Sequence, residues 1–267
     1  FNESIDQALA ESVDSYSANL ANSRDMFLAI LGHDLRSPLA SLNGCLELLD
    51  TPGVRPAHRE QALCIAKRSV ASVNSMVIDL LEYTCTRLGQ GIKVEPRPGD
   101  LGLLCRSAVD EIKAAYPRRS LAAEVLGELR GSFDAARLRQ VLINLLSNAL
   151  QHGDPESPVV LTARSLGERL TIEVRNHGTP IPPEAMQVIF DPLVQIPAMA
   201  STTPERPGSS LGLGLFIARE IVMAHGGKIS VSSSHAEGTT FVVELPHEAR
   251  ARPPREGAQG SPSPVGV

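Results

Sequence analysis

Residues 139–153 read RQVLINLLSNALQHG, and their pattern determines the architecture of the C-terminal half of the chain. Apolar residues recur here every three or four positions, which predicts an amphipathic helix from Ala135 to Gln151. Asn144, Asn148 and His152 are spaced four residues apart, so they line one face of that helix while the leucines turn toward a core. One helix face therefore carries two amides and an imidazole.

Two amide side chains in one line suit a hydrated cation that bridges phosphate groups. Magnesium keeps several waters and takes few protein oxygens, so the amide oxygens of Asn144 and Asn148 are adequate ligands when phosphates supply others. Asparagines also occur on the solvated face of ordinary helices. The spacing by itself therefore leaves a purely structural interpretation open.

The segments around this helix alternate between strand and helix patterns. We expect a sheet covered by helices on one face, forming a domain over residues 101–247, and a disordered tail of Arg, Pro, Gly and Ser over residues 248–267. Besides a short strand pair, the predicted elements are helices Leu103–Ala115 and Leu213–His225 and strands Val159–Ala163, Leu170–Asn176, Lys228–Ser232 and Thr240–Leu245.

The N-terminal half has the pattern of a helical hairpin. Leucines three or four residues apart mark a helix up to about residue 49, residues 51–56 interrupt it, and a second apolar series runs from Ala62 to Leu80. One hairpin cannot enclose its own apolar stripe, so we expect two chains to form a four-helix bundle, that is, a homodimer. The fold class is therefore α+β, with a signalling helix over 1–23, a dimerisation domain over 24–88 and a linker over 89–100.

His33 stands in the run HDLRSPL and points away from the leucine stripe of the first helix. A neutral imidazole on the wet face of a bundle is a competent nucleophile near pH 7. Asp34 can orient an imidazole proton, Arg36 can meet phosphate charge, and Pro38 breaks a helical hydrogen bond. The alternative is a surface histidine beside a proline kink, which does not account for the whole run.

Residues 211–227, LGLGLFIAREIVMAHGG, place two glycines immediately before a predicted helix. Gly212 and Gly214 let backbone N–H groups approach phosphate oxygens at the helix N-terminus. Upstream, a strand ends in a turn at Gly178, with two prolines after it. A lone pair of glycines, or a lone turn, is weak support for a binding site.

Taken together, these motifs resemble those of sensor histidine kinases. The run FLAILGHDLRSPLASLNG resembles the phospho-acceptor box, and RQVLINLLSNALQHG resembles the asparagine box of the Bergerat-type ATPase fold. The stretch after Gly212 resembles the glycine box, and the resemblance covers roughly residues 20–247. It implies a dimerisation hairpin followed by an α/β-sandwich ATP-binding domain, with ATP and Mg²⁺ as cofactors.

Asn176 to Pro180 looks like the adenine-recognition box of the same family, but with departures. The family's usual aspartate, which accepts from the exocyclic amine of adenine, is replaced by Asn176. The amide keeps an acceptor oxygen and loses the charge-assisted strength of that hydrogen bond. The expected loss in nucleotide affinity is about 1 kcal/mol.

The resemblance implies a role for each matching position. The catalytic residues are His33, Asp34 and Asn144, and Asn148 holds Mg²⁺. The residues implied to bind the nucleotide are Asn148, Gln151, His152, Asn176, Gly178, Ile181, Phe190, Leu211, Gly212, Leu213, Gly214 and Thr240.

The implied function is a protein-histidine kinase of a two-component system. It would phosphorylate His33 from ATP and pass the phosphoryl group to an aspartate in the receiver domain of a response regulator. One alternative is a degenerate kinase that acts as a dimeric scaffold, which the change at Asn176 favours. Another is a different Bergerat-fold ATPase, but such proteins lack the upstream hairpin, and many of the hydrolases among them carry a glutamate where this chain has Asn144.

Composition also limits the classes of partner that this chain is expected to bind. A net charge of −5 without a Lys/Arg block argues against nucleic acid as a binding partner. The sequence contains no run of eighteen apolar residues, so we expect no membrane contact within this segment. The four cysteines have no CxxC spacing, so we expect buried, reduced thiols and a cytoplasmic location. Because the chain begins at Phe1, we expect that an upstream sensor region, either membrane-anchored or soluble, is missing.

Overall fold

The computed structural model describes residues 32, 34–89, 91–167, 169–196 and 211–247. These residues divide into two compact units: one runs to Val77 and includes Leu211, and the other holds the remaining described residues from Ile78. The predicted signalling helix, the whole predicted tail over residues 248–267 and His33 lie outside the described residues. Among the helices that are described, none is long and apolar enough to cross a membrane.

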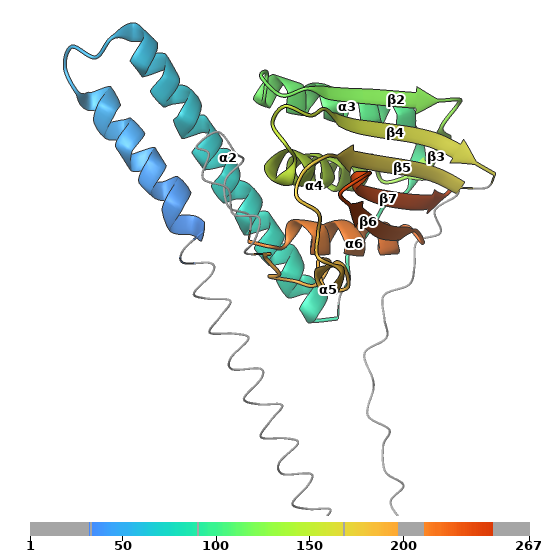
Figure 1. Cartoon of the computed structure of the whole chain (residues 1–267). Coiled ribbons are helices and arrows are strands. Elements are labelled where there is room, and N and C mark those ends of the chain that lie inside the picture. Colours follow the sequence, from blue (N-terminus) through green and yellow to red (C-terminus); the bar gives the residue numbers. More distant parts are fainter. Residues whose placement is uncertain (1–31, 33, 90, 168, 197–210, 248–267) are drawn as a thin grey trace, which may run out of the picture. The chain divides into compact units, whose positions relative to one another are not determined.

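The first unit contains most of the predicted hairpin, and residues 78–87 of its second helix belong to the second unit. A helix over residues 34–50 is followed by a turn and by the antiparallel helix α2 (Pro56–Arg87), as Figure 1 shows. Pro56 occupies the first position of α2, where a missing N–H costs no helical hydrogen bond. The few buried side chains include Cys45, Ala62 and Met76, while many apolar side chains face outward. A single hairpin thus leaves much of its apolar stripe exposed.

The second unit is built on a five-stranded sheet. β2 pairs in parallel with β4, and the remaining neighbours are antiparallel. In spatial order the strands are β2 (Leu121–Leu126), β4 (Val159–Leu166), β5 (Arg169–Asn176), β7 (Gly238–Pro246) and β6 (Lys228–Ser234). A separate two-stranded ladder pairs β1 (Arg97–Asp100) with β3 (Arg130–Phe133).

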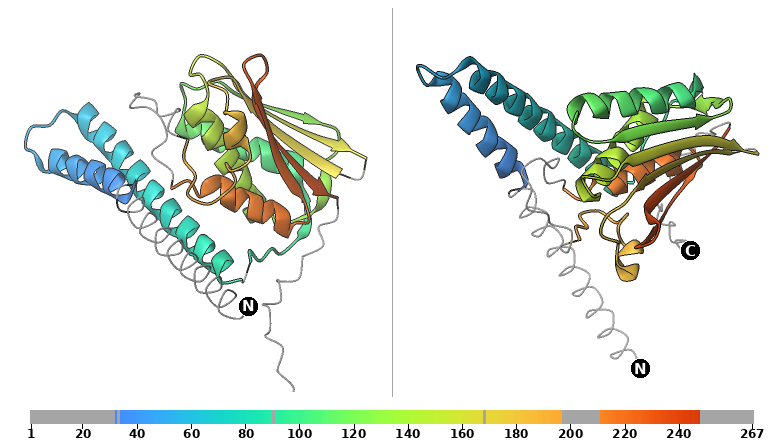
Figure 2. Two further views of the ribbon diagram at one scale, coloured as in Figure 1. Left: turned by 60° about the horizontal axis from the view of Figure 1, so that its bottom comes forward. Right: turned by 45° about the horizontal axis from the view of Figure 1, so that its top comes forward.

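Three helices cover one face of the sheet (Figure 2). α3 (Leu101–Ala115) packs on β2 and β4, α4 (Ala135–His152) on β4 and β5, and α6 (Gly214–Ala224) on β6 and β7. The short helix α5 (Pro183–Met186) follows β5. The predicted α+β class, with helices on one face, is confirmed.

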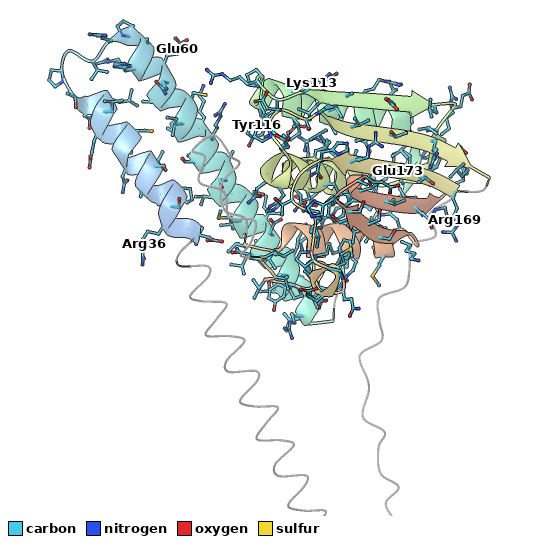
Figure 3. All side chains as sticks on the ribbon, in the orientation of Figure 1. Arg36, Glu60, Lys113, Tyr116, Arg169 and Glu173 are labelled. Atoms are coloured by element: carbon cyan, nitrogen blue, oxygen red, sulfur yellow. The ribbon has the colours of Figure 1, made fainter. Side chains whose placement is uncertain are left out.

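The other face of the sheet is polar. Arg164 pairs with Glu173 across β4 and β5, and Arg169 lies 3.6 Å from Glu244 on β7. Figure 3 labels Arg169 and Glu173 among these surface side chains. Apolar side chains therefore gather between the sheet and α3, α4 and α6, where the core lies.

Two sequence expectations differ from the structure. The last four residues of the predicted linker 89–100 form β1, because they find a strand partner in β3. Two of the four cysteines, Cys64 and Cys85, are exposed on α2, so the expectation of burial was wrong for them. Cys105 is buried on α3, and burial raises the pKa of its thiol to about 12.

Candidate functional site

The polar line of α4 is the centre of the candidate site. Asn144 and Asn148 are half-buried, whereas the leucines between them are fully buried. The helix begins where it does because the Asp134 carboxylate caps it, with Oδ1 accepting from the backbone N–H groups of Ala136 and Arg137 at 3.1 Å each. The cap thus sets the start of the helix that carries both asparagines.

Asn144 connects α4 to the start of α6. Its Nδ2 donates to the backbone carbonyl of Gly214 at 3.0 Å, so its Oδ1 is the acceptor end of the amide. A Cβ at Gly214 would lie 3.6 Å from the Asn144 side chain. The residue before α6, Leu213, makes no side-chain cap, so the first-turn N–H groups of α6 have the geometry that binds an anion.

The backbone before α6 is folded tightly against the segment after α5. The Leu193 N–H donates to the Gly212 carbonyl at 3.0 Å, and a Cβ at Gly212 would lie 2.8 Å from the Val194 carbonyl oxygen. Leu193 and Gly212 both have a positive φ, of 67° and 68°. Two segments that the sequence predicts at the nucleotide therefore meet through their backbones.

The predicted adenine turn is tied to the C-terminal end of α4. Gly153 and Gly178 form an isolated bridge, and the Asp154 N–H donates to the His177 carbonyl at 2.7 Å. A Cβ at Gly178 would lie 2.7 Å from the His152 carbonyl oxygen, so only glycine fits. Asn176 precedes this turn, is buried, and donates from Nδ2 to the His177 carbonyl at 3.3 Å.

Strand register adds a residue that the sequence reasoning missed. Thr239 on β7 lies opposite Asn176, and its hydroxyl is 2.7 Å from Ser233 Oγ, which also accepts from the Ile181 N–H at 2.9 Å. Thr240 lies opposite Arg175, on the polar face of the sheet. The structure therefore brings Thr239, and not Thr240, to the other predicted site residues. In the sequence, Thr239 is in phase with the apolar Phe241, Val243 and Leu245, and this period-two pattern is the signal that could have placed it on the core face of the strand.

The remaining predicted nucleotide-binding residues are largely packing residues. Ile181, Leu211 and Leu213 are buried. The ring of Phe190 meets the edge of Phe241, with centroids 6.2 Å apart. These side chains fix the backbone around the site more than they offer polar contacts.

The phospho-acceptor region belongs to the first unit. His33 lies outside the described residues, whereas Asp34 beside it is buried. Arg36 is exposed and points outward from the hairpin (Figure 3). In the second unit, Gln151 and His152 are half-buried at the end of α4.

The side chains present fit a nucleotide with a bridging cation. Within the part of the chain that the structure describes, no three His, Cys, Asp or Glu side chains are grouped so that they could hold a metal ion. A cation at Asn148 would therefore take most of its ligands from phosphate oxygens and water, as Mg²⁺ commonly does. The uncapped start of α6 would supply N–H donors for such phosphates.

Comparison with known proteins follows the same division of the chain. Residues 23–89 match the family model "His Kinase A (phospho-acceptor) domain", and residues 133–249 match "Histidine kinase-, DNA gyrase B-, and HSP90-like ATPase". Among curated relatives, the bacteriophytochrome of Pseudomonas aeruginosa is 30% identical over 87% of this chain. The probable sensor histidine kinase TcrY of Mycobacterium tuberculosis is 35% identical over 82% of this chain.

A solved structure of histidine kinase ThkA in complex with the response regulator protein TrrA is also similar. Its TM-score is 0.57 at 25% identity, covering 82% of this chain and 60% of that one. The chain spans 31% of the bacteriophytochrome and 45% of TcrY. With a phospho-acceptor hairpin and an ATPase domain in this order, the chain belongs to the family of two-component sensor histidine kinases.

Proposed function

We propose that this chain binds ATP beside α4, transfers the terminal phosphoryl group to His33, and passes it to an aspartate of a response regulator. The observation that carries the proposal is the hydrogen bond from Asn144 to Gly214, which places an amide of α4 at the uncapped start of α6. The match of the hairpin to the phospho-acceptor family supports the choice of a histidine acceptor.

The proposed nucleotide site has two ends, one on each side of the polar line of α4. The backbone N–H groups from Gly212 to Gly214 hold phosphate oxygens, with Asn148 as the Mg²⁺ ligand and Asn144 assisting. At the other end, Asn176 and Thr239 face the adenine. Their juxtaposition across β5 and β7 supports this assignment.

The proposed chemistry is a direct phosphoryl transfer. A ring nitrogen of His33 forms a bond to the terminal phosphorus of ATP, and the bond from that phosphorus to the bridging oxygen breaks, so ADP leaves. Asp34 draws on the proton of the imidazole's other nitrogen. In the second step the nitrogen–phosphorus bond breaks as a carboxylate oxygen of the regulator's aspartate takes the phosphoryl group. Catalysis rests mainly on positioning and on charge neutralisation.

We also propose that the chain is a homodimer. Leu39, Leu46, Leu63, Val70 and Leu81 each leave between 46% and 59% of their surface exposed in one chain. Burying such a stripe against a second hairpin gives a four-helix bundle, which removes these side chains from water.

A second candidate function is a scaffold that binds nucleotide weakly. The neutral side chain of Asn176, at the position where the family has an aspartate, favours it. This candidate predicts a folded dimer that does not phosphorylate itself.

One experiment separates the two candidates. The purified chain, His33→Gln and the matched control His58→Gln, which alters an exposed histidine of α2, are incubated with Mg²⁺ and γ-labelled ATP. We expect acid-labile, alkali-stable label on the wild type and on the control, and none on His33→Gln. Label that persists on His33→Gln would show another acceptor, and an unlabelled but folded wild-type dimer would favour the scaffold.

A further inference from the structure

His225, the residue that follows α6, is a fully buried histidine with no part in the proposed chemistry. Its Nε2 lies 3.0 Å from the backbone N of Asp134, and its Nδ1 lies 2.8 Å from the Ile221 carbonyl oxygen. A backbone N–H can only donate and a carbonyl can only accept. The ring must therefore be the neutral tautomer with its proton on Nδ1.

The Asp134 end of this contact is the start of the helix that carries the asparagines. Asp134 caps α4, and its Oδ2 also accepts from the Glu95 N–H at 3.0 Å. The imidazole thus connects the end of α6 to the start of α4, across 91 residues of sequence. It also gives the backbone N–H of Asp134, a half-buried residue, its hydrogen-bond acceptor.

The same two helices make a second contact at their other ends. Asn144 donates to Gly214. On α4, Asn144 comes ten residues after Asp134, and on α6, Gly214 comes eleven residues before His225. At 1.5 Å per helical residue, the spans are about 15 Å on α4 and about 16 Å on α6, so the helices run antiparallel between two fixed points. A shift of α6 along α4 would break both contacts together.

The charge state of the ring suits this role. Burial lowers the pKa of His225 below its ordinary value, although the Ile221 carbonyl and the charge of Asp134 act in the opposite sense. Burial alone would raise the pKa of Asp134, but the N–H groups of Glu95, Arg137 and Ala136 and the nearby His225 leave it lowered. Near pH 7 the ring is therefore neutral and can accept, while the cap is ionised.

We propose that His225 is a positioning residue that sets the register of α6 against α4. It thereby places the phosphate-binding start of α6 opposite Asn144 and Asn148. This inference rests on the proposed nucleotide site. It predicts that the imidazole acts on ATP binding from the far end of α6, about 16 Å from Gly214.

Two substitutions in the full chain test this role. In His225→Gln, the amide oxygen reaches the position of Nε2 and can accept from the Asp134 N–H. In His225→Asn, the side chain reaches only the position of Nδ1, so the contact within α6 can be kept while the contact with α4 is lost. The two variants are close in size and polarity, which makes each a control for the other.

The measured quantities are the dissociation constant of a non-hydrolysable ATP analogue, kcat and KM for autophosphorylation, and hydrogen exchange of the Asp134 amide. We expect His225→Asn to raise the dissociation constant and KM about tenfold with a smaller change in kcat, because the Asp134 N–H loses its acceptor on α6 and the register of the two helices loosens. His225→Gln should stay within about threefold of the wild type. A folded His225→Asn that binds the analogue as tightly as the wild type would overturn the proposal.

Hydrogen exchange in the wild-type protein covers the case in which His225→Asn does not fold. A saturating ATP analogue should slow exchange of the Asp134 amide, because the nucleotide and the imidazole stabilise the same helix register. Unchanged exchange would refute the coupling. A wild-type chain that binds no analogue fails the proposed function instead, so the two failures are distinguishable.

Discussion

Replacement of Gly238 by alanine tests whether the start of β7 is shaped around Asn176. Gly238 has a φ of 77°, and a Cβ there would lie 2.3 Å from the backbone oxygen of Asn176. Gly127, in the loop after β2, has a similar φ of 84°, but no atom lies within 4 Å of its added Cβ. Gly127→Ala is therefore the matched control, because it introduces the same backbone strain as Gly238→Ala without the steric collision.

The expected magnitudes follow from these two terms. An alanine in the left-handed region destabilises the folded state by about 1–2 kcal/mol. Alanine also restricts the unfolded chain, which stabilises the folded state by about 0.4–1 kcal/mol, so Gly127→Ala should cost about 1 kcal/mol in total. The collision at Gly238 adds about 1–3 kcal/mol, because the obstructing atom belongs to the backbone of β5. Gly238→Ala should therefore cost about 2–4 kcal/mol, or roughly 5–15 °C in Tm.

Thermal unfolding followed by circular dichroism measures both variants, and an ATP analogue measures the effect on the site. Because the collision displaces Asn176, Gly238→Ala should also weaken binding of the analogue, while Gly127→Ala should not. Equal Tm values and equal affinities for the two variants would refute the reasoning.

Two further predictions concern residues that tertiary contacts place. Thr239→Val should weaken binding of the ATP analogue and destabilise the domain by about 1 kcal/mol, because it removes the hydroxyl beside Ser233; Thr240→Val, on the polar face, should do neither. Unfolding by urea and nucleotide titration compare the pair, and equal effects of the two substitutions would contradict the assignment of Thr239, in place of Thr240, to the site. For pH, the folded state keeps His225 neutral while the unfolded chain gains a proton below pH 6.5, so stability should fall as pH drops below 6.5, by up to about 1.4 kcal/mol per unit. The lowered pKa of Asp134 acts only as pH falls below 3.8, so the two windows are separate. His225→Gln should flatten the decline that begins below pH 6.5 in urea titrations, and an unchanged slope would contradict the role of His225.

Local periodicity was sufficient for the hairpin and for α4. The leucine spacing and the interruption over residues 51–56 predicted two helices, and the structure has them over 34–50 and Pro56–Arg87. The polar line through Asn144 and Asn148 was likewise predicted, because a helix repeats every 3.6 residues and its faces can be assigned from sequence alone.

Strand partners could not be assigned in this way. The segment Arg97–Asp100 has the composition of a linker, and it becomes β1 only because β3 lies beside it. Thr239 and Thr240 are chemically alike, and the register of β7 against β5 decides which one lies opposite Asn176. A shift of one residue would exchange their faces.

By itself, the sequence determined the family, the two domains and the helix that carries the asparagines, since these depend on motifs and on local periodicity. Only the tertiary structure connected His225 to Asp134 and Asn144 to Gly214. Those contacts join residues many positions apart, and their distances depend on how α6 packs along α4. Helical repeats are encoded within a few residues, whereas the register between two elements is settled only when both bury their apolar faces in the same core.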